Sequence, residues 1–219
     1  MLLNLHTHSN YSDGSNSLGE LVSAFIGQGH ACLCLTDHDY TMTLETYERQ
    51  LKEAAELEKV NEFPIICGLE TSTGFDSEEA LLFGTEACKE WLSLRRANNL
   101  MPTGSSWYFD EGQFLKWAKH TKAEKALVLC HPALSSQLQD FYSIFDGYEI
   151  QNSGCLWPKY SRDLMKNLMP KAKAFRNYDL HTLAVFWGIQ DIQKRFPCNE
   201  VPDDFSLKNE ADLMRYIKG

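Results

Sequence analysis

The feature that most constrains this sequence is the alternation of short apolar runs with longer amphipathic stretches along its 219 residues. Such alternation is typical of repeated strand and helix units around a parallel sheet or barrel. The runs that read as strands are 2–8, 31–36, 64–69, 80–84, 127–130, 148–150 and 172–178. The sequence therefore predicts a mixed α/β fold.

Helical spacing of apolar residues predicts the elements between these strands. Ser17 precedes such a stretch, which ends near Gly27 and Gly29, and a charged helix is predicted over 44–60. A last helix presents Leu213, Met214 and Ile217 on one face. Residues 85–125 form one long excursion between the fourth and fifth strands, which we interpret as an insertion with a lid-like or substrate-selecting role.

The bulk composition favours one domain over residues 1–219, because 43% of the residues are hydrophobic and can bury one substantial core. The net charge of −9 argues against a surface that coats nucleic acid. An anionic substrate would need bound cations to reverse the local field.

The cysteines and the amino terminus predict a cytoplasmic protein. Seven scattered cysteines form no C-x-x-C pair, so we interpret them as reduced thiols. Met1 to Leu5 lead directly into His6 without the features of an export signal. No apolar run approaches the ~20 residues needed to span a bilayer, so we expect no membrane association.

Five of the seven histidines lie at or just past the carboxyl ends of predicted strands: His6, His8, His38, His131 and His181. Side chains from distant parts of a sequence converge at that end of parallel sheets and barrels. Residues two apart on a strand share a face, so His6 and His8 are expected to point inward, and Leu3 and Leu5 toward outer helices. Two imidazoles on one face make a plausible metal clamp.

Carboxylates accompany these histidines. Asp13 lies in a Ser-Asp-Gly turn, Glu70 ends the third strand, and Asp179 precedes His181 by two residues. A buried acid such as Glu70 is costly unless a partner or a metal neutralises it. Mixed imidazole and carboxylate ligands suit zinc, manganese or iron and do not select one of them.

These motifs, in this order, resemble those of the PHP (polymerase and histidinol phosphatase) family. The matching segments are His6-Thr7-His8-Ser9, Ser12-Asp13-Gly14, Thr36-Asp37-His38-Asp39, Gly68-Leu69-Glu70, His131-Pro132, Asp146 to Asn152 and Asp179-Leu180-His181. The resemblance implies a distorted (β/α)7 TIM-like barrel with two to three divalent metal ions at the carboxyl ends of its strands.

The resemblance also implies how the ligands divide among the metals. His6, His8, Glu70 and Asp179 would hold a first ion, and Glu70 would bridge to a second ion held by His131. Asp13, His38 and His181 would hold a third. At the start of the fourth strand many family members have a histidine, where this chain has Glu79, which we interpret as a substitute oxygen ligand or a solvated acidic turn.

Other polar residues are expected to be structural. Cys130 precedes His131 and should face the opposite way on its strand, as a core residue. His30, at a turn between a helix and a strand, is expected at the surface.

The predicted function is hydrolysis of a phosphate ester by a metal-activated water, with a small phosphomonoester or nucleotide as substrate. His38, Asp39 or His181 can protonate the leaving group. An exonuclease-type phosphodiesterase on short oligonucleotides is the enzymatic alternative, and a metal-binding module without activity is the alternative outside catalysis. The oligomeric state stays open.

Overall fold

The computed structural model describes residues 1–74, 78–97, 111–132, 139–152, 159–186 and 198–219. Among them, six strands form one sheet in the order β2-β3-β4-β5-β6-β7, and β1 pairs with β8. The strands are β1 (Leu2–Leu3), β2 (Leu33–His38), β3 (Ile65–Ser72), β4 (Glu79–Phe83), β5 (Ala126–Cys130), β6 (Gly147–Gln151), β7 (Lys173–Arg176) and β8 (Asn199–Glu200). The mixed α/β fold is confirmed.

Helices connect most of these strands. They are α1 (Leu18–Gly27), α2 (Leu44–Asn61), α3 (Thr85–Ala97), α4 (Glu111–His120), α5 (Gln139–Tyr142), α6 (Lys159–Leu168), a 3-10 turn η1 (Leu183–Phe186) and α8 (Glu210–Lys218). Ser17 starts α1 with a capping box, because its side chain accepts from the amide of Glu20 while Glu20 accepts from the Ser17 amide.

The sheet is not parallel throughout. β4 runs antiparallel to both of its neighbours, β3 and β5, whereas the pairs β2–β3, β5–β6 and β6–β7 are parallel. The expectation of an all-parallel arrangement is therefore wrong at β4. The cause is the short connection between β3 and β4, because a parallel crossover needs a dozen or more residues.

The predicted first strand, Leu2–His8, is regular only over its first two residues. Asn4 interrupts it, because the Asn4 Nδ2 donates to the carbonyl oxygen of His6 (2.9 Å) and to the Thr7 Oγ1 (2.7 Å). These bonds replace part of a regular ladder. The alternation of faces along the segment is consequently broken between Leu5 and His6.

The rest of this segment lies between the two edges of the sheet. The Thr36 amide of β2 donates to the Thr7 carbonyl (2.9 Å), and the His8 amide donates to the Leu180 carbonyl (2.8 Å). Thr7 and Leu180 form an isolated parallel bridge. Within the described ranges these contacts do not complete a continuous barrel.

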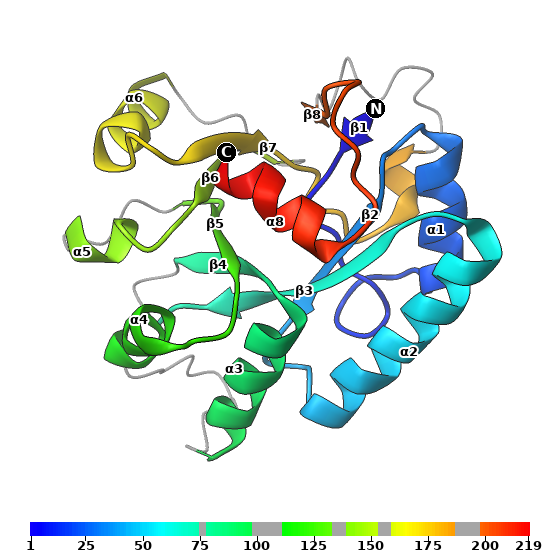
Figure 1. Cartoon of the computed structure of the whole chain (residues 1–219), viewed down its shortest axis with the longest axis horizontal. Helices are drawn as coiled ribbons and strands as arrows, with labels where there is room; N and C mark the ends of the chain where they lie inside the picture. Colours follow the sequence, from blue (N-terminus) through cyan, green and yellow to red (C-terminus); the bar gives the residue numbers. More distant parts are fainter. Residues whose placement is uncertain (75–77, 98–110, 133–138, 153–158, 187–197) are drawn as a thin grey trace.

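Two apolar clusters lie on opposite faces of the sheet. The outer cluster contains strand residues such as Leu35 and Leu82 together with residues of the six helices from α1 through α6, which surround the sheet in Figure 1. The inner cluster joins Leu3, Leu5, Cys34, Ile66, Phe83 and Val128 to Leu213 and Ile217 of α8. Leu3 and Leu5 therefore face inward, contrary to the prediction. The predicted last helix is confirmed as α8, which crosses the inner side of the sheet in Figure 1.

The described parts of the 85–125 excursion are packed elements. Trp91 of α3 and Phe114 and Trp117 of α4 belong to the outer cluster. Residues 98–110 lie outside the described residues, so both the lid-like role and the single-domain organisation stay predictions. Among the helices of the described residues, none is long and apolar enough to cross a membrane.

Candidate metal centre

The structure brings all nine predicted ligand residues to one end of the sheet. They occur in four overlapping groups in which one ligand atom per residue lies within 4.8 Å of the others. The groups are His6, Glu70, Cys130 and His131; His8, Asp13, His38 and His181; His6, His8 and Asp179; and His38, Glu70 and Glu79. Their role as metal ligands stays a prediction.

His6 and His8 converge on one point inside the fold. Their Nε2 atoms are 3.1 Å apart, and each lies 3.4 Å from the Asp179 Oδ1. Both histidines are buried. Asp179 reaches them from a left-handed backbone conformation, with φ of 51°, which is uncommon for residues other than glycine and concentrates at functional sites.

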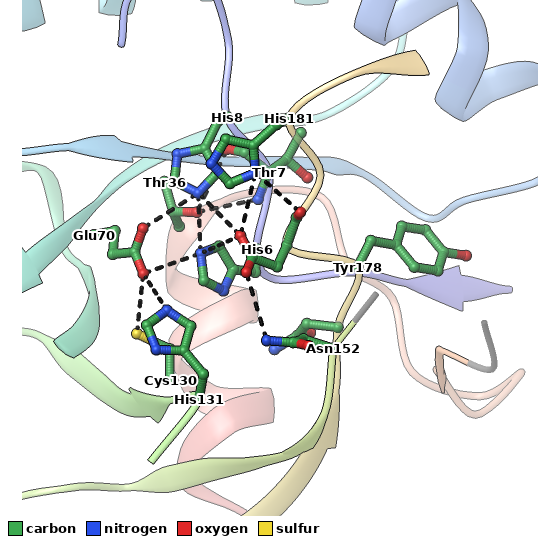
Figure 2. Close-up of polar contacts among 12 residues, drawn as sticks. His6, Thr7, His8, Thr36, Glu70, Cys130, His131, Asn152, Tyr178 and His181 are labelled. Atoms are coloured by element: carbon green, nitrogen blue, oxygen red, sulfur yellow. Dashed lines mark hydrogen bonds and ion pairs between the residues drawn. The ribbon is translucent and has the colours of Figure 1, made fainter. Parts of the chain in front are cut away.

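Glu70 divides its two carboxylate oxygens between two sets of nitrogen atoms (Figure 2). The Oε1 lies 2.8 Å from the His131 Nε2 and 3.3 Å from the His6 Nε2. The Oε2 lies 3.2 Å from the His8 Nε2 and 3.1 Å from the His38 Nδ1. This is the arrangement of a carboxylate that can bridge two cations.

Asp13 lies close to the imidazoles of His8, His38 and His181, which form a third set of ligand atoms with it. Its Oδ2 lies 3.5 Å from the His38 Nε2 and 3.4 Å from the His181 Nε2, and its Oδ1 lies 3.6 Å from the His8 Nδ1. The side chains of Asp13 and His181 are 43% and 41% exposed. This set therefore forms the solvent-facing side of the cluster.

The loop that carries Asp13 is held by Asp37. The Asp37 carboxylate accepts from the Ser9 amide (2.7 Å), from the Ser9 Oγ (2.7 Å) and from the Ser12 Oγ (2.5 Å). Gly14 lets the loop approach closely, because a Cβ atom there would lie 2.4 Å from the His8 carbonyl oxygen. Asp37 thus positions Asp13 without entering the cluster.

Glu79 lies at the beginning of β4, which meets the carboxyl ends of the parallel strands because β4 runs the opposite way. Its Oε2 is 3.5 Å from the His131 Nε2, and it groups with His38 and Glu70. Burial, reinforced by the charge of Glu70, raises the pKa of Glu79 to about 7. The Glu79 carboxylate therefore lies at the cluster and is not part of a solvated turn.

His131 and Cys130 both face the cluster, whereas Cys130 was predicted to face the opposite way. Cys130 faces inward, with its Sγ 3.3 Å from the Glu70 Oε1. His131 follows the end of β5 and reaches the cluster through a backbone φ of 26°. The simple alternation of a strand does not apply to a residue beyond its end, so the prediction that Cys130 faces away is wrong.

Asp39 is a second correction, because its carboxylate is directed to α3 and not to the cluster. It pairs with Arg95 and accepts from the Trp91 Nε1 (2.8 Å) and from the Thr71 Oγ1 (2.5 Å). The side chains of Asp39 and Arg95 are 0% and 2% exposed. A carboxylate buried in such a network is a structural ion pair and is not placed to protonate a leaving group.

Glu149 contacts the candidate ligands and was not singled out by the sequence reasoning. Its Oε1 accepts from the His6 Nδ1 (2.9 Å) and from the Asn177 Nδ2 (2.8 Å), and its Oε2 accepts from the His131 amide (2.7 Å). A carboxylate on the far nitrogen of a metal-binding histidine fixes the orientation and tautomer of the ring. The available signal was a glutamate within a short buried strand.

Tyr40 was missed as well. Its ring lies over His38, with ring centroids 4.6 Å apart. Burial raises the pKa of Tyr40 to about 12, so its hydroxyl keeps its proton at neutral pH. His30 was misplaced, because its side chain is buried and not at the surface.

Burial and neighbouring charges shift the pKa values of the cluster residues in opposite directions. Burial disfavours ionised Glu70, but His6, His131 and His8 outweigh it and hold the pKa of Glu70 well below its usual value. Burial also opposes protonation of His8 and His131, yet the hydrogen bonds that their rings donate to neighbouring carboxylates raise the pKa of each to about 9. Divalent cations fit this donor set, because they can replace imidazole protons in balancing the carboxylates.

Comparisons with known proteins agree with this geometry. The family model of the PHP domain matches residues 4–156, more than two thirds of the chain. No curated protein matches the chain significantly. Among solved structures, a protein from Bifidobacterium adolescentis assigned as a metal-dependent phosphoesterase is 14% identical, with a TM-score of 0.58, and the match covers 98% of this chain and 94% of that one.

Two further structures share the fold. A two-domain protein from Bacteroides vulgatus containing a predicted PHP-like metal-dependent phosphoesterase is 18% identical, with a TM-score of 0.55, over 89% of this chain and 55% of that chain. An amidohydrolase from Chromobacterium violaceum, solved with bound sulfate and no metal, is 16% identical, with a TM-score of 0.53, over 93% of both chains. By the family match over residues 4–156, this chain belongs to the PHP domain family.

Proposed function

We propose that this chain is a metal-dependent phosphoesterase that hydrolyses a small phosphomonoester or nucleotide with a metal-activated water. The observation that carries the proposal is the carboxylate of Glu70, whose two oxygens face two different sets of imidazole nitrogens at 2.8–3.3 Å. A bridging carboxylate with histidines on both sides suits a centre of two or three divalent ions of manganese, zinc or iron.

In the proposal, the overlapping groups correspond to ion positions. His6, His8 and Asp179 hold one ion, Glu70 and His131 a second, and Asp13, His38 and His181 a third. Glu79 supplies an oxygen ligand to the second. The proposed fold is a distorted (β/α)7 TIM-like barrel in which the segment 4–8 adds one strand to the six strands β2 to β7. The bridge between Thr7 and Leu180 and the hydrogen bond from Thr36 to Thr7 support this placement.

Bound cations would lower the pKa of a water molecule and neutralise charge on the phosphoryl group. The residues of the chain hold and orient the site. Glu149 orients His6, and Asp37 holds the loop of Asp13. Because Asp13 and His181 are its most exposed members, a phosphate ester would approach from their side.

His181 and His38 are the candidates to give a proton to the leaving group. The side chain of His181 is 41% exposed and that of His38 is 12% exposed, so both can meet a substrate. The described cysteines are free thiols, which supports the proposed cytoplasmic setting.

Substrate class is tested with protein loaded with manganese, zinc or iron in separate preparations. We expect turnover of p-nitrophenyl phosphate and of nucleoside monophosphates, and little turnover of bis-p-nitrophenyl phosphate or short oligonucleotides. Activity confined to the diester or the oligonucleotides would replace the monoesterase by the exonuclease-type phosphodiesterase.

The metal centre is tested with His8→Ala and Asp179→Ala, each combined with elemental analysis. Both variants should lose turnover and bound metal while their circular dichroism stays that of the parent chain. Near-normal activity in either variant would refute the assignment. Less than one ion per parent chain after reconstitution, without phosphatase activity, would instead support a non-catalytic module.

A further inference from the structure

Cys130 occupies a position in the cluster that the sheet register fixes. It is the last residue of β5 and lies directly opposite Glu79 of β4. Residues directly opposite in an antiparallel pair project to the same face. Both side chains therefore point to the inner face, where Glu70 also projects.

The sulfur of Cys130 lies among ligand atoms. Its Sγ is 3.3 Å from the Glu70 Oε1, the same oxygen that lies 3.3 Å from the His6 Nε2 and 2.8 Å from the His131 Nε2. These four side chains form one group of converging ligand atoms. Figure 2 shows Cys130 and His131 side by side below Glu70.

The other inner cysteines provide a contrast. Cys32 and Cys34 are equally buried on the inner face, and their sulfur atoms are 3.5 Å from each other. Neither belongs to a group of metal-ligand atoms among the described residues. Cys130 is thus distinguished by its contact with Glu70 and not by burial.

We propose that Cys130 is a thiolate ligand at the second ion position, together with Glu70, Glu79 and His131. The inference rests on the proposed metal centre and adds which metal ion its second position prefers. A set of one imidazole, two carboxylates and one thiolate matches the ligand types and the four-coordinate number that zinc takes in proteins. Thiolate is a poor ligand for manganese and magnesium, so this position prefers zinc.

Binding of the metal through the Cys130 sulfur balances in protons and electrons. The Cys130 thiol releases its proton to solvent as the sulfur–metal bond forms, and no oxidant or reductant is required. The hydrogen bond to Glu70 is lost in the same step, which leaves the Oε1 available to the metal.

Cobalt(II) titration of the full chain after chelation tests the inference spectroscopically. Cobalt reports its site through visible d–d bands, and a sulfur ligand adds a charge-transfer band in the near ultraviolet. We expect both in the parent chain, loss of the charge-transfer band with retained d–d bands in Cys130→Ser, and both retained in the matched control Cys34→Ser.

The outcomes separate this inference from the proposed function. Visible bands without the charge-transfer band in the parent chain overturn the thiolate ligand and leave the metal centre in place. Absence of all cobalt bands overturns both. A charge-transfer band that survives in Cys130→Ser, or disappears in Cys34→Ser, assigns the sulfur elsewhere and overturns the proposal.

Metal competition gives a second measurement, which does not depend on activity. Cys130→Ser and Cys130→Ala should lower the affinity ratio of zinc to manganese by about tenfold or more, the size typical of weakened ligand sets. Circular dichroism shows which of the two Cys130 variants is folded, and the comparison with the parent chain uses that variant. An unchanged ratio in folded variants contradicts the proposal.

Discussion

Glu149 shows how one buried carboxylate can organise the cluster without joining it. It accepts from the ring of His6, from the amide of His131 and from the side chain of Asn177. Its two oxygens accept three donors, so the His6 ring is fixed with its Nε2 toward Asp179 and Glu70. The orientation of a ligand from the first segment thus depends on β6.

Glu149→Gln should reduce metal affinity and turnover about 10- to 100-fold, the usual cost of losing such a partner. The amide keeps the size of the side chain but offers one oxygen and one NH2 group to three donors. Isothermal titration with zinc, combined with turnover measurements, checks the expectation. Glu200→Gln, at an exposed position on β8, is the matched control and should leave both quantities unchanged.

Glu79→Ala tests whether Glu79 is a ligand of the second ion. Since the Glu79 Oε2 lies 3.5 Å from the His131 Nε2, a ligand role predicts fewer bound ions per chain after dialysis. Elemental analysis measures the ions. The control is Glu86→Ala on α3, whose side chain is 77% exposed. Equal metal content in the two variants would show that Glu79 is not a ligand.

At the scale of elements, the pair of Asp39 and Arg95 ties α3 to the end of β2. Asp39 follows His38 directly, so the residue next to a candidate ligand is anchored on an outer helix. Trp91 adds an indole hydrogen bond from the same helix. Movement of α3 would therefore be transmitted to the backbone beside His38.

Arg95→Met should lower the free energy of unfolding by about 3–5 kcal/mol, because it leaves a buried carboxylate without its ion partner. The double variant Asp39→Asn with Arg95→Met should recover most of that loss. Urea unfolding measures both. Arg215→Met is the control, since its 65% exposed side chain pairs with Asp212 at the surface and such pairs contribute about 0–1 kcal/mol. A double variant no more stable than Arg95→Met would contradict the account.

The convergence of the ligands could be predicted because several predicted strands end in, or lead directly into, a histidine or an acid, and strand ends meet in this class of fold. The partners of Asp39 could not be predicted, since Arg95 lies far along the chain on an amphipathic helix, and its contact with Asp39 depends on tertiary packing. The faces of Cys130 and Leu3 were mispredicted for local reasons. Cys130 and His131 both face the cluster because His131 lies beyond the end of its strand with a positive φ, and Asn4 interrupts the first segment with side-chain hydrogen bonds.

At the scale of the whole molecule, the cluster draws its ligands from residue 6 to residue 181 of the sequence, so the complete fold is needed to assemble it. Outside this cluster, His30 forms an isolated parallel bridge with Leu2 ahead of β2. Its ring packs against Phe25 and the edge of Tyr178, with ring centroids 4.5 and 5.6 Å away. His30 is thus a buried titratable group, and its protonation affects the free energy of unfolding of the whole chain.

Burial lowers the pKa of His30 to about 4, with a small opposing effect from the Phe25 carbonyl. Its pKa in the unfolded chain is about 6.5. The stability associated with neutral His30 is therefore complete above about pH 6.5 and is lost as the pH falls toward about 4. The full loss amounts to about 3 kcal/mol. Urea unfolding of the parent chain and of His30→Leu, between pH 7.5 and the lowest pH at which both fold, measures it.

The histidines of the cluster also titrate, so both proteins are compared in the presence of a chelator and only the difference between their unfolding free energies is interpreted. That difference should be constant above about pH 7 and should shift in favour of His30→Leu as the pH falls, because leucine has no proton to bind in the unfolded chain. A constant difference for His30→Leu over the whole range would mean that the folded chain accommodates the charged ring, and the assignment of His30 as a neutral core residue would be wrong.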